Sequence, residues 1–250
     1  MHIPTHIDHF EREAADMAAA AELHGPDAEI PTCPGWTMRN LVIHTGAVHR
    51  YAFDNLTHNR NDWPESSLEE FAGEHPTNQD LVGWFRSGAN ELVNALRTTP
   101  EDHQTFAFLP APSPLAFWAR RQAHETAIHR VDAQSASGEV SPIASDLAAD
   151  GIDEMLTGFA VRPSKNRPDA RICSLLVSPT DSDQKWLVTM GPDGVTTMRN
   201  PVDVSNAQAT VIGTASDLNL VVWNRTQFAT IAIAGDSTVL DQWTKTVRIR

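Results

Sequence analysis

The stretch QAHETAIHRVDAQ, residues 122–134, brings two histidines and a glutamate close together in the sequence. Zinc proteases carry the pattern H-E-x-x-H, in which two histidines four residues apart share one helix face. Here His124 and His129 are five residues apart, or about 140° around a helix, so they cannot hold the same ion. Glu125 and His129 differ by only about 40° and can do so. The stretch therefore predicts a metal-binding pair and excludes the protease motif.

Asp132 lies on the same helical stripe, because it is three residues after His129 and seven after Glu125. Such a carboxylate can orient a metal-bound histidine from behind. A surface ion pair with a nearby arginine is an equally good interpretation of Asp132. Two ligands are too few for a catalytic zinc, which usually takes three protein groups and keeps one position open. A third ligand must come from another part of the chain.

His44 is the best candidate for that third ligand. It is three residues after Leu41 and four before Val48, so it is central to the apolar stripe of a predicted helix. His49 is about 140° from His44 and is expected to face solvent or the rim. A lone inward histidine is more often a core residue bonded to a carbonyl, but Glu125 and His129 independently offer two further ligands on another helix.

The first 160 residues have helical periodicity throughout. Apolar residues recur every three or four positions, and prolines or glycines separate the runs. Thr37, Thr77 and Ser113 are the expected N-caps of the later long helices, with Pro114 in the first turn of the last of these. Residues 57–76 are polar and are expected to be a long connection. The predicted helices cover residues 6–24, 34–56, 77–99, 113–138 and 145–159.

After residue 160 the pattern changes to short strand-like runs bounded by Pro, Asp, Asn and Gly. They are residues 171–178, 185–191, 194–200, 207–213 and 228–235, with two helices predicted over 215–224 and 237–245. This order predicts two domains, a helical one over 1–160 and an antiparallel α+β one over 161–250. Four-helix bundles commonly hold metal sites built from inward-facing side chains.

The charge distribution also distinguishes the two parts. The chain has a formal net charge of −13. The first 159 residues hold 9 basic and 24 acidic side chains, whereas the remaining residues hold 10 and 8. So acidic a surface argues against nucleic-acid binding, because phosphates require a basic footprint.

Composition gives further expectations about the environment of the protein. Cys33 and Cys173 are the only cysteines, which indicates a reducing cytosol rather than a disulfide framework. No run approaches ~18 apolar residues, so no membrane span is expected. The polar, acidic N-terminus is unlike a signal peptide. We expect a cytoplasmic protein that is a monomer or weak dimer.

Four segments together resemble one known family. CPGWTMRNLVIHTGAVHRYA (33–52) and WARRQAHETAIHRVDAQ (118–134) closely resemble the two hallmark segments of the mycothiol-dependent maleylpyruvate isomerase family. That family belongs to the DinB-like metalloenzymes, which are common in actinobacteria. VIGTASDLNLVVWNR (211–225) and IAGDSTVLDQW (233–243) match its C-terminal module. The resemblance implies a DinB-like four-helix bundle followed by a small α+β domain with an antiparallel sheet.

The resemblance also implies a set of site residues. It implies a metal, usually zinc, held by His44, Glu125 and His129, which are the residues that the helical geometry selects. The family uses an arginine of its second domain near the site, and this matches Arg225. Many members have glycine before that arginine, whereas this chain has Asn224. Mycothiol is the implied thiol cofactor.

This ligand set suggests how a thiol could be activated. Two imidazoles and one carboxylate leave zinc a net positive charge and an open position, and such an ion deprotonates a coordinating thiol. We expect an isomerase that adds the thiolate to a cis double bond and releases the trans product, or an S-transferase that releases the adduct. Arg225 and Arg130 could steady a carboxylate or an enolate. Trp36 could line the pocket or anchor its helix, and Cys33 fits a small buried thiol better than a nucleophile.

Two other functions remain compatible with the sequence. One is a zinc-dependent hydrolase or amidase that needs no thiol. The other is a non-catalytic bundle whose polar triad is a remnant, with a second domain that binds a ligand or partner. Imidazole and carboxylate ligands also suit other divalent metals, and a fold does not identify a substrate.

Overall fold

The computed structural model describes residues 1–58, 68–162 and 171–247. The chain divides into two compact units, Met1–Ser141 and Pro142–Arg250. Within the described residues, no helix is long and apolar enough to cross a bilayer.

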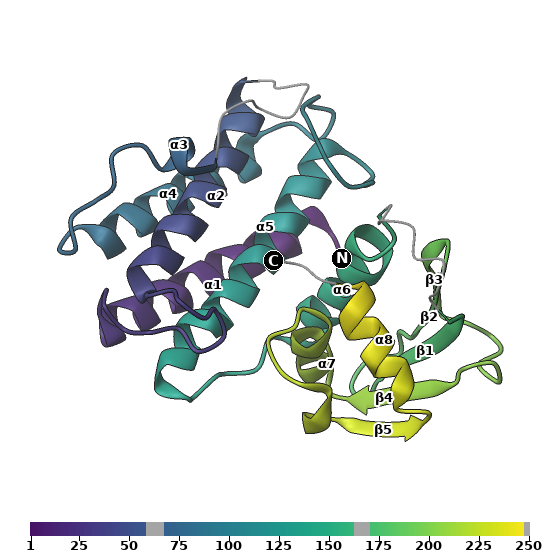
Figure 1. Cartoon of the computed structure of the whole chain (residues 1–250). Coiled ribbons are helices and arrows are strands. Elements are labelled where there is room, and N and C mark those ends of the chain that lie inside the picture. Colours follow the sequence, from purple (N-terminus) through teal and green to yellow (C-terminus); the bar gives the residue numbers. More distant parts are fainter. Residues whose placement is uncertain (59–67, 163–170, 248–250) are drawn as a thin grey trace. The chain divides into compact units, whose positions relative to one another are not determined.

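The first unit is built from four long helices, which confirms the predicted helical bundle (Figure 1). Helix α1 packs against α5 and α4, and α2 packs against α4 and α5. The inward stripes hold buried side chains such as Phe10, Leu41, Phe85 and Trp118. The elements are α1 (Ile3–His24), α2 (Met38–His58), the short α3 (Leu68–Ala72), α4 (Leu81–Thr98), α5 (Pro114–Gln134) and a 3₁₀ turn (Ser135–Ser137).

Helix α5 begins where the sequence predicts. Ser113 caps it by accepting a hydrogen bond from the backbone N–H of Ala116 at 3.2 Å, and Pro114 occupies the first turn. Most α5 side chains are buried around the whole helix, as expected for the central helix of a bundle. Several charged side chains of α5 therefore lie in a water-poor environment, where their pairing with one another and with α1 stabilises them.

The other two expected caps have different outcomes. The backbone N–H of Thr37 donates to Oδ1 of Asn40, and that of Asn40 donates to the Thr37 hydroxyl, just before α2 begins. Thr77 does not cap α4 directly, because a turn over 78–80 separates it from Leu81. Its hydroxyl instead donates to Asp80 at 2.6 Å.

Helices α2 and α4 approach each other closely at Gly46. A Cβ atom at this position would overlap the indole ring of Trp84. Arg50, one turn further along α2, stacks over the same ring at 3.7 Å and donates to the Trp84 carbonyl at 2.9 Å. Because glycine has no Cβ atom, Gly46 allows α2 and α4 to approach this closely.

In its described residues, the second unit combines one five-stranded sheet with three α-helices and a short 3₁₀ turn (Phe228–Thr230). The strand order is β3-β2-β1-β4-β5, and β1 and β4 are parallel whereas the other neighbours are antiparallel. The strands are β1 (Cys173–Pro179), β2 (Trp186–Gly191), β3 (Gly194–Arg199), β4 (Ala209–Gly213) and β5 (Ala232–Gly235). The helices are α6 (Ser145–Glu154, continued by a π turn over Met155–Phe159), α7 (Ala215–Val222) and α8 (Thr238–Thr246).

Several details differ from the sequence expectations. The chain contacts divide the units at residues 141 and 142 rather than 160 and 161, because α6 packs against α7 of the second unit. The connection expected over 57–76 contains α3, and its residues 59–67 lie outside the described part. The parallel β1–β4 pair is not apparent from alternation alone, because alternation predicts faces but not strand direction.

Candidate metal site

The three predicted ligands meet at one point between α2 and α5. Nε2 of His44 lies 3.7 Å from Oε1 of Glu125, and Nε2 of His129 lies 3.1 Å from the same oxygen. One ligand atom from each residue lies within 4.8 Å of the other two. Zinc ligands stand about 2.1 Å from the ion, or roughly 3.4 Å from one another in a tetrahedron. Small side-chain rotations would therefore bring these atoms to ligand spacing.

Helix spacing explains this convergence. Glu125 and His129 are one turn apart on α5, so their side chains point the same way. His44 comes from the facing side of α2, and its ring lies edge-on to the His129 ring, with centroids 5.2 Å apart. The site thus depends on the packing of two helices rather than on a loop.

Asp132 supports His129 from the side opposite Glu125. Its carboxylate lies 2.8 Å from Nδ1 of His129, and its side chain is fully buried. Burial alone would lower the pKa of His129, but the contacts with Asp132 and Glu125 outweigh it and raise that pKa to about 9. A carboxylate on the second nitrogen is the usual arrangement behind a metal-ligating histidine.

Arg121 supports Glu125 in a similar way. Its guanidinium donates to Oε2 of Glu125 at 2.7 Å, and the arginine is almost fully buried. Burial would raise the pKa of Glu125, but the charge of Arg121 and the contacts with His129 and His44 hold it well below its usual range. Glu125 is thus kept as a carboxylate, with Oε1 directed toward the two histidines. The donor set fits a divalent metal such as zinc.

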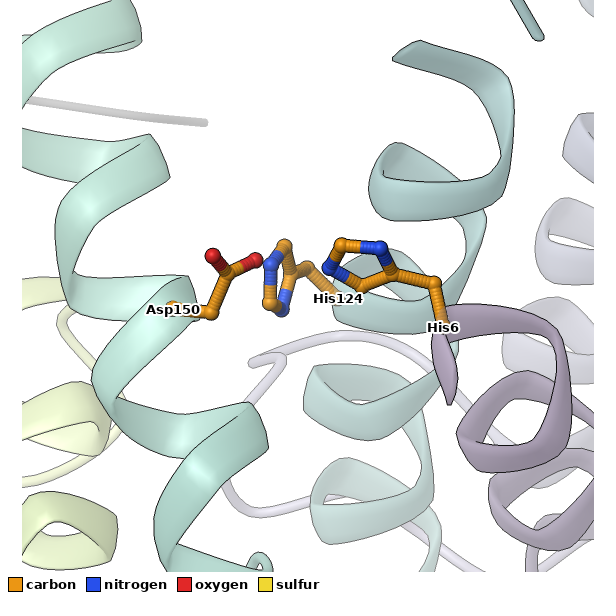
Figure 2. Close-up of side chains that lie close together, drawn as sticks. All are labelled: His6, His124 and Asp150. Atoms are coloured by element: carbon orange, nitrogen blue, oxygen red, sulfur yellow. The ribbon is translucent and has the colours of Figure 1, made fainter. Parts of the chain in front are cut away.

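Two other histidines of the same helices do not join this cluster. Figure 2 shows His124 on α5 beside His6 of α1, and their ring centroids are 6.0 Å apart. This agrees with the prediction that His124 and His129 point in different directions. His49 was expected at the solvent or the rim, and that expectation is wrong, because the residue is fully buried.

His49 is buried because residues of α1, α4 and α5 all pack against its side of α2. Its ring lies against Phe10 of α1 and Phe85 of α4, with centroids 5.0 and 5.2 Å away. Its Nε2 lies 2.9 Å from the hydroxyl of Thr126. Burial lowers the pKa of His49 to about 3, so it is neutral.

A pocket of about 360 Å³ adjoins His44. Its walls include Trp36, Arg39, Ile43, His44, Leu68 and His75. The Trp36 ring meets the His44 ring edge-on, with centroids 5.1 Å apart. Trp36 therefore lines a pocket next to the metal site, which is one of the two roles expected for it.

Arg225 lies in the second unit, directly after α7. Asn224 has φ +59°, in the left-handed region that glycine occupies readily and asparagine tolerates. The N–H of Arg225 bonds to the Leu220 carbonyl at 2.8 Å, and that of Asn224 to the Val221 carbonyl at 3.0 Å. This is a Schellman ending, and its left-handed residue is of a kind that glycine also adopts readily. Arg225 as a site residue stays a prediction.

Two other sequence candidates have different surroundings. Arg130 is buried and donates to Glu13 at 2.7 Å and to Gln134 at 2.9 Å. The contact with Glu13 ties α5 to α1, and the contact with Gln134 lies within α5. These contacts give Arg130 a structural role, and its expected role in steadying a substrate stays a prediction. Cys33 is partly exposed, so the expectation of a buried thiol is wrong. It comes before α2 and does not belong to the ligand cluster.

Sequence reasoning missed Arg121 and Arg39. Arg121 is four residues before Glu125, and that spacing alone indicates an ion pair on one helix face. Arg39 lies five residues before His44, and only the folded pocket reveals its relevance.

Comparison with known proteins gives consistent results. Residues 7–134 match the family described as the mycothiol maleylpyruvate isomerase N-terminal domain, and residues 146–242 match the MDMPI C-terminal domain. A search of curated proteins found no match.

Two solved structures are similar over nearly the full length. A crystal structure of the mycothiol-dependent maleylpyruvate isomerase has a TM-score of 0.65 and 16% identity, covering 94% of this chain and 93% of that one. A histidine-to-alanine mutant of that isomerase has a TM-score of 0.63, with the same identity and coverage. These structures show the fold, and the two domain matches place this chain in the mycothiol-dependent maleylpyruvate isomerase family.

Proposed function

We propose that this chain is a metal- and mycothiol-dependent enzyme that activates a thiol for addition to an electrophilic substrate. Its reaction is either a maleylpyruvate isomerase-like cis–trans isomerisation or the transfer of the thiol to the substrate. The observation that carries the proposal is the convergence of His44, Glu125 and His129. The family membership supports the thiol.

The ligand set decides what chemistry the site can support. When bound, a zinc ion and a thiol would together supply a nucleophilic sulfur, whose reversible addition to a double bond permits rotation and re-elimination. Asp132 fixes the orientation of His129, and Arg121 fixes that of Glu125. Trp36 forms an apolar wall beside His44. Arg225 is proposed to stabilise negative charge on the substrate by charge-assisted hydrogen bonds.

Metal analysis of His44→Ala tests the ligand assignment. We expect about one zinc per chain in the wild-type protein and loss of that zinc in the variant, because two remaining ligands bind weakly. His58→Ala is the matched control, because His58 lies at the exposed end of the same helix. Asp132→Asn should weaken zinc binding about 10- to 100-fold without abolishing it. A wild-type protein that binds no divalent metal at micromolar concentration would contradict the proposal.

A thiol-dependence assay tests the reaction. Maleylpyruvate is followed with and without mycothiol, and a panel of electrophiles is screened for thiol conjugates by mass spectrometry. We expect turnover only when both metal and thiol are present. Turnover without any thiol would instead indicate a metal-dependent hydrolase. Metal binding without turnover of any electrophile would indicate a binding protein.

A further inference from the structure

The pocket beside His44 has an unusual charge composition for this protein. The whole chain carries 32 acidic residues, but the described residues that line this pocket include no Asp or Glu. They include Arg39 and two histidines, together with apolar side chains such as Trp36 and Ile43. Such a lining favours an anionic ligand with an apolar or unsaturated body.

Arg39 is held in place by neutral acceptors. Its guanidinium donates to the carbonyl of Pro76 and to Oδ1 of Asn78, each at 2.8 Å. None of the ion pairs found among the described residues involves Arg39. A guanidinium carries more N–H donors than these two bonds use, so the bonds orient Arg39 and leave further donors for a ligand. A carboxylate is the ligand that such a fork binds best.

Arg39 and His44 line the same pocket from one helix. They are five residues apart on α2, about 7.5 Å along its axis, and both belong to the pocket lining. One ligand can therefore place a carboxylate at Arg39 and its reactive carbon beside His44. The carboxylate that meets Arg39 is then a different group from the carbon that reacts.

We propose that Arg39 binds the remote carboxylate of the electrophilic substrate and thereby selects anionic over neutral electrophiles. This inference rests on the proposed function, because the reacting group is placed at the site of His44. Arg39 would act in binding, whereas His44 and its partners act on the reacting atoms. Its contribution should appear in KM more than in kcat.

Steady-state kinetics of Arg39→Met with maleylpyruvate tests this assignment. We expect KM for maleylpyruvate to rise about tenfold or more, because a charge-assisted hydrogen bond is lost. We expect kcat to change by less than a factor of three and KM for mycothiol to stay unchanged. Arg39→Lys should recover part of the loss, since it retains the charge but not the fork. Arg86→Met is the matched control, because Arg86 pairs with Glu22 on the exposed surface of α4.

A purely structural role for Arg39 predicts a different result. Arg39 also ties the start of α2 to Pro76 and Asn78, and Asn78→Ala removes one of these bonds while leaving the charge. If Asn78→Ala reproduces the effect of Arg39→Met, or if both KM values rise together, the assignment is overturned. It is also overturned if Arg39→Met leaves KM for maleylpyruvate unchanged.

A binding measurement separates this inference from the proposed function. Maleate is titrated calorimetrically into the zinc-loaded protein without thiol, and dimethyl maleate serves as the neutral probe. We expect Arg39→Met to weaken maleate binding at least tenfold and to leave the ester unaffected. Arg39-dependent binding in a protein that fails every thiol-dependent assay would uphold the binding role of Arg39 and refute the proposed function. Thiol-dependent turnover, together with equal maleate binding by the wild-type protein and Arg39→Met, would uphold the proposed function and refute the binding role of Arg39.

Discussion

At the scale of single residues, His49 shows how burial changes the chemistry of a side chain. Phe10 and Phe85 pack against its ring, and its Nε2 lies 2.9 Å from the hydroxyl of Thr126. Its pKa is lowered to about 3 by burial, whereas an unfolded chain would have a histidine pKa near ~6.5. The unfolded state therefore binds a proton at a pH where the folded state does not.

This difference predicts a loss of stability in acid. Below pH ~6.5 the unfolded state gains the proton, so the free energy of unfolding falls as the pH falls toward 3. At pH 5 the loss from His49 alone is about 2 kcal/mol. Urea unfolding of the wild-type protein and of His49→Phe at pH 7 and pH 5 measures this loss of unfolding free energy. The variant should lose less stability between the two pH values.

A control variant makes this test specific. His58 is largely exposed at the end of the same helix, so His58→Phe should keep the acid sensitivity of the wild-type protein. Equal pH dependence in the wild-type protein and His49→Phe would contradict the assignment to His49.

Part of the site can be predicted from the sequence, because the residues that share one face of a helix follow from their spacing along the chain. One turn separates Glu125 from His129, and the stripe through Leu41 makes His44 an inward candidate. The environment of His49 could not be predicted in this way. A helix covered by neighbours on several sides buries residues outside its main stripe, and only the tertiary packing decides which.

At the scale of elements, the packing of α2 against α4 positions His44. Gly46 is two residues after His44 and allows the Trp84 ring to lie directly against the α2 backbone. Because a side chain here has no space, even a small one must displace α2 or the ring. The position of His44, the proposed metal ligand on α2, is therefore sensitive to a residue outside the ligand set.

Gly46→Ala should lower both stability and metal affinity. Overpacking of this kind typically costs about 1–3 kcal/mol, and a shift of α2 moves His44 away from Glu125. Thermal unfolding and zinc titration measure the two effects. Gly83→Ala on α4 is the matched control, because a Cβ there meets nothing within 4 Å, and it should stabilise the helix by about 0.5–1 kcal/mol. Unchanged zinc affinity in Gly46→Ala would refute the positional argument.

The elements themselves could be predicted better than their arrangement. Ser113 and Pro114 define the start of α5 through local capping chemistry, which needs no tertiary information. The division between the units could not be predicted, because α6 is an ordinary amphipathic helix in sequence. Its contact with α7 assigns it to the second unit, and such a contact joins residues far apart in the chain.

At the scale of the whole molecule, the two units differ in what they contain. All three proposed metal ligands, and the partners Asp132 and Arg121, lie between Met1 and Ser141. The second unit contains the sheet and Arg225. A metal should therefore stabilise the two units unequally.

Removal of the metal should lower the melting temperature of the first unit. Zinc at 100 times its dissociation constant adds about 2.7 kcal/mol to the stability of the state that binds it, or roughly 5–10 °C for a domain of this size. Differential scanning calorimetry before and after chelation, with zinc added back, measures the shift. If the units melt separately, only one transition should move. A chelator that changes nothing would contradict metal binding to the folded first unit.

The edge-on contact between Trp36 and His44 also makes Trp36 an intrinsic fluorescence probe of the proposed metal site. Indole emission responds to the charge and polarity of whatever lies a few ångströms from the ring, and here that neighbour is a proposed ligand. Filling or emptying the cavity beside it should therefore alter the light that the protein emits, without any attached dye. Occupancy could then be followed in real time by subtracting the signal of Trp36→Phe from that of the natural chain.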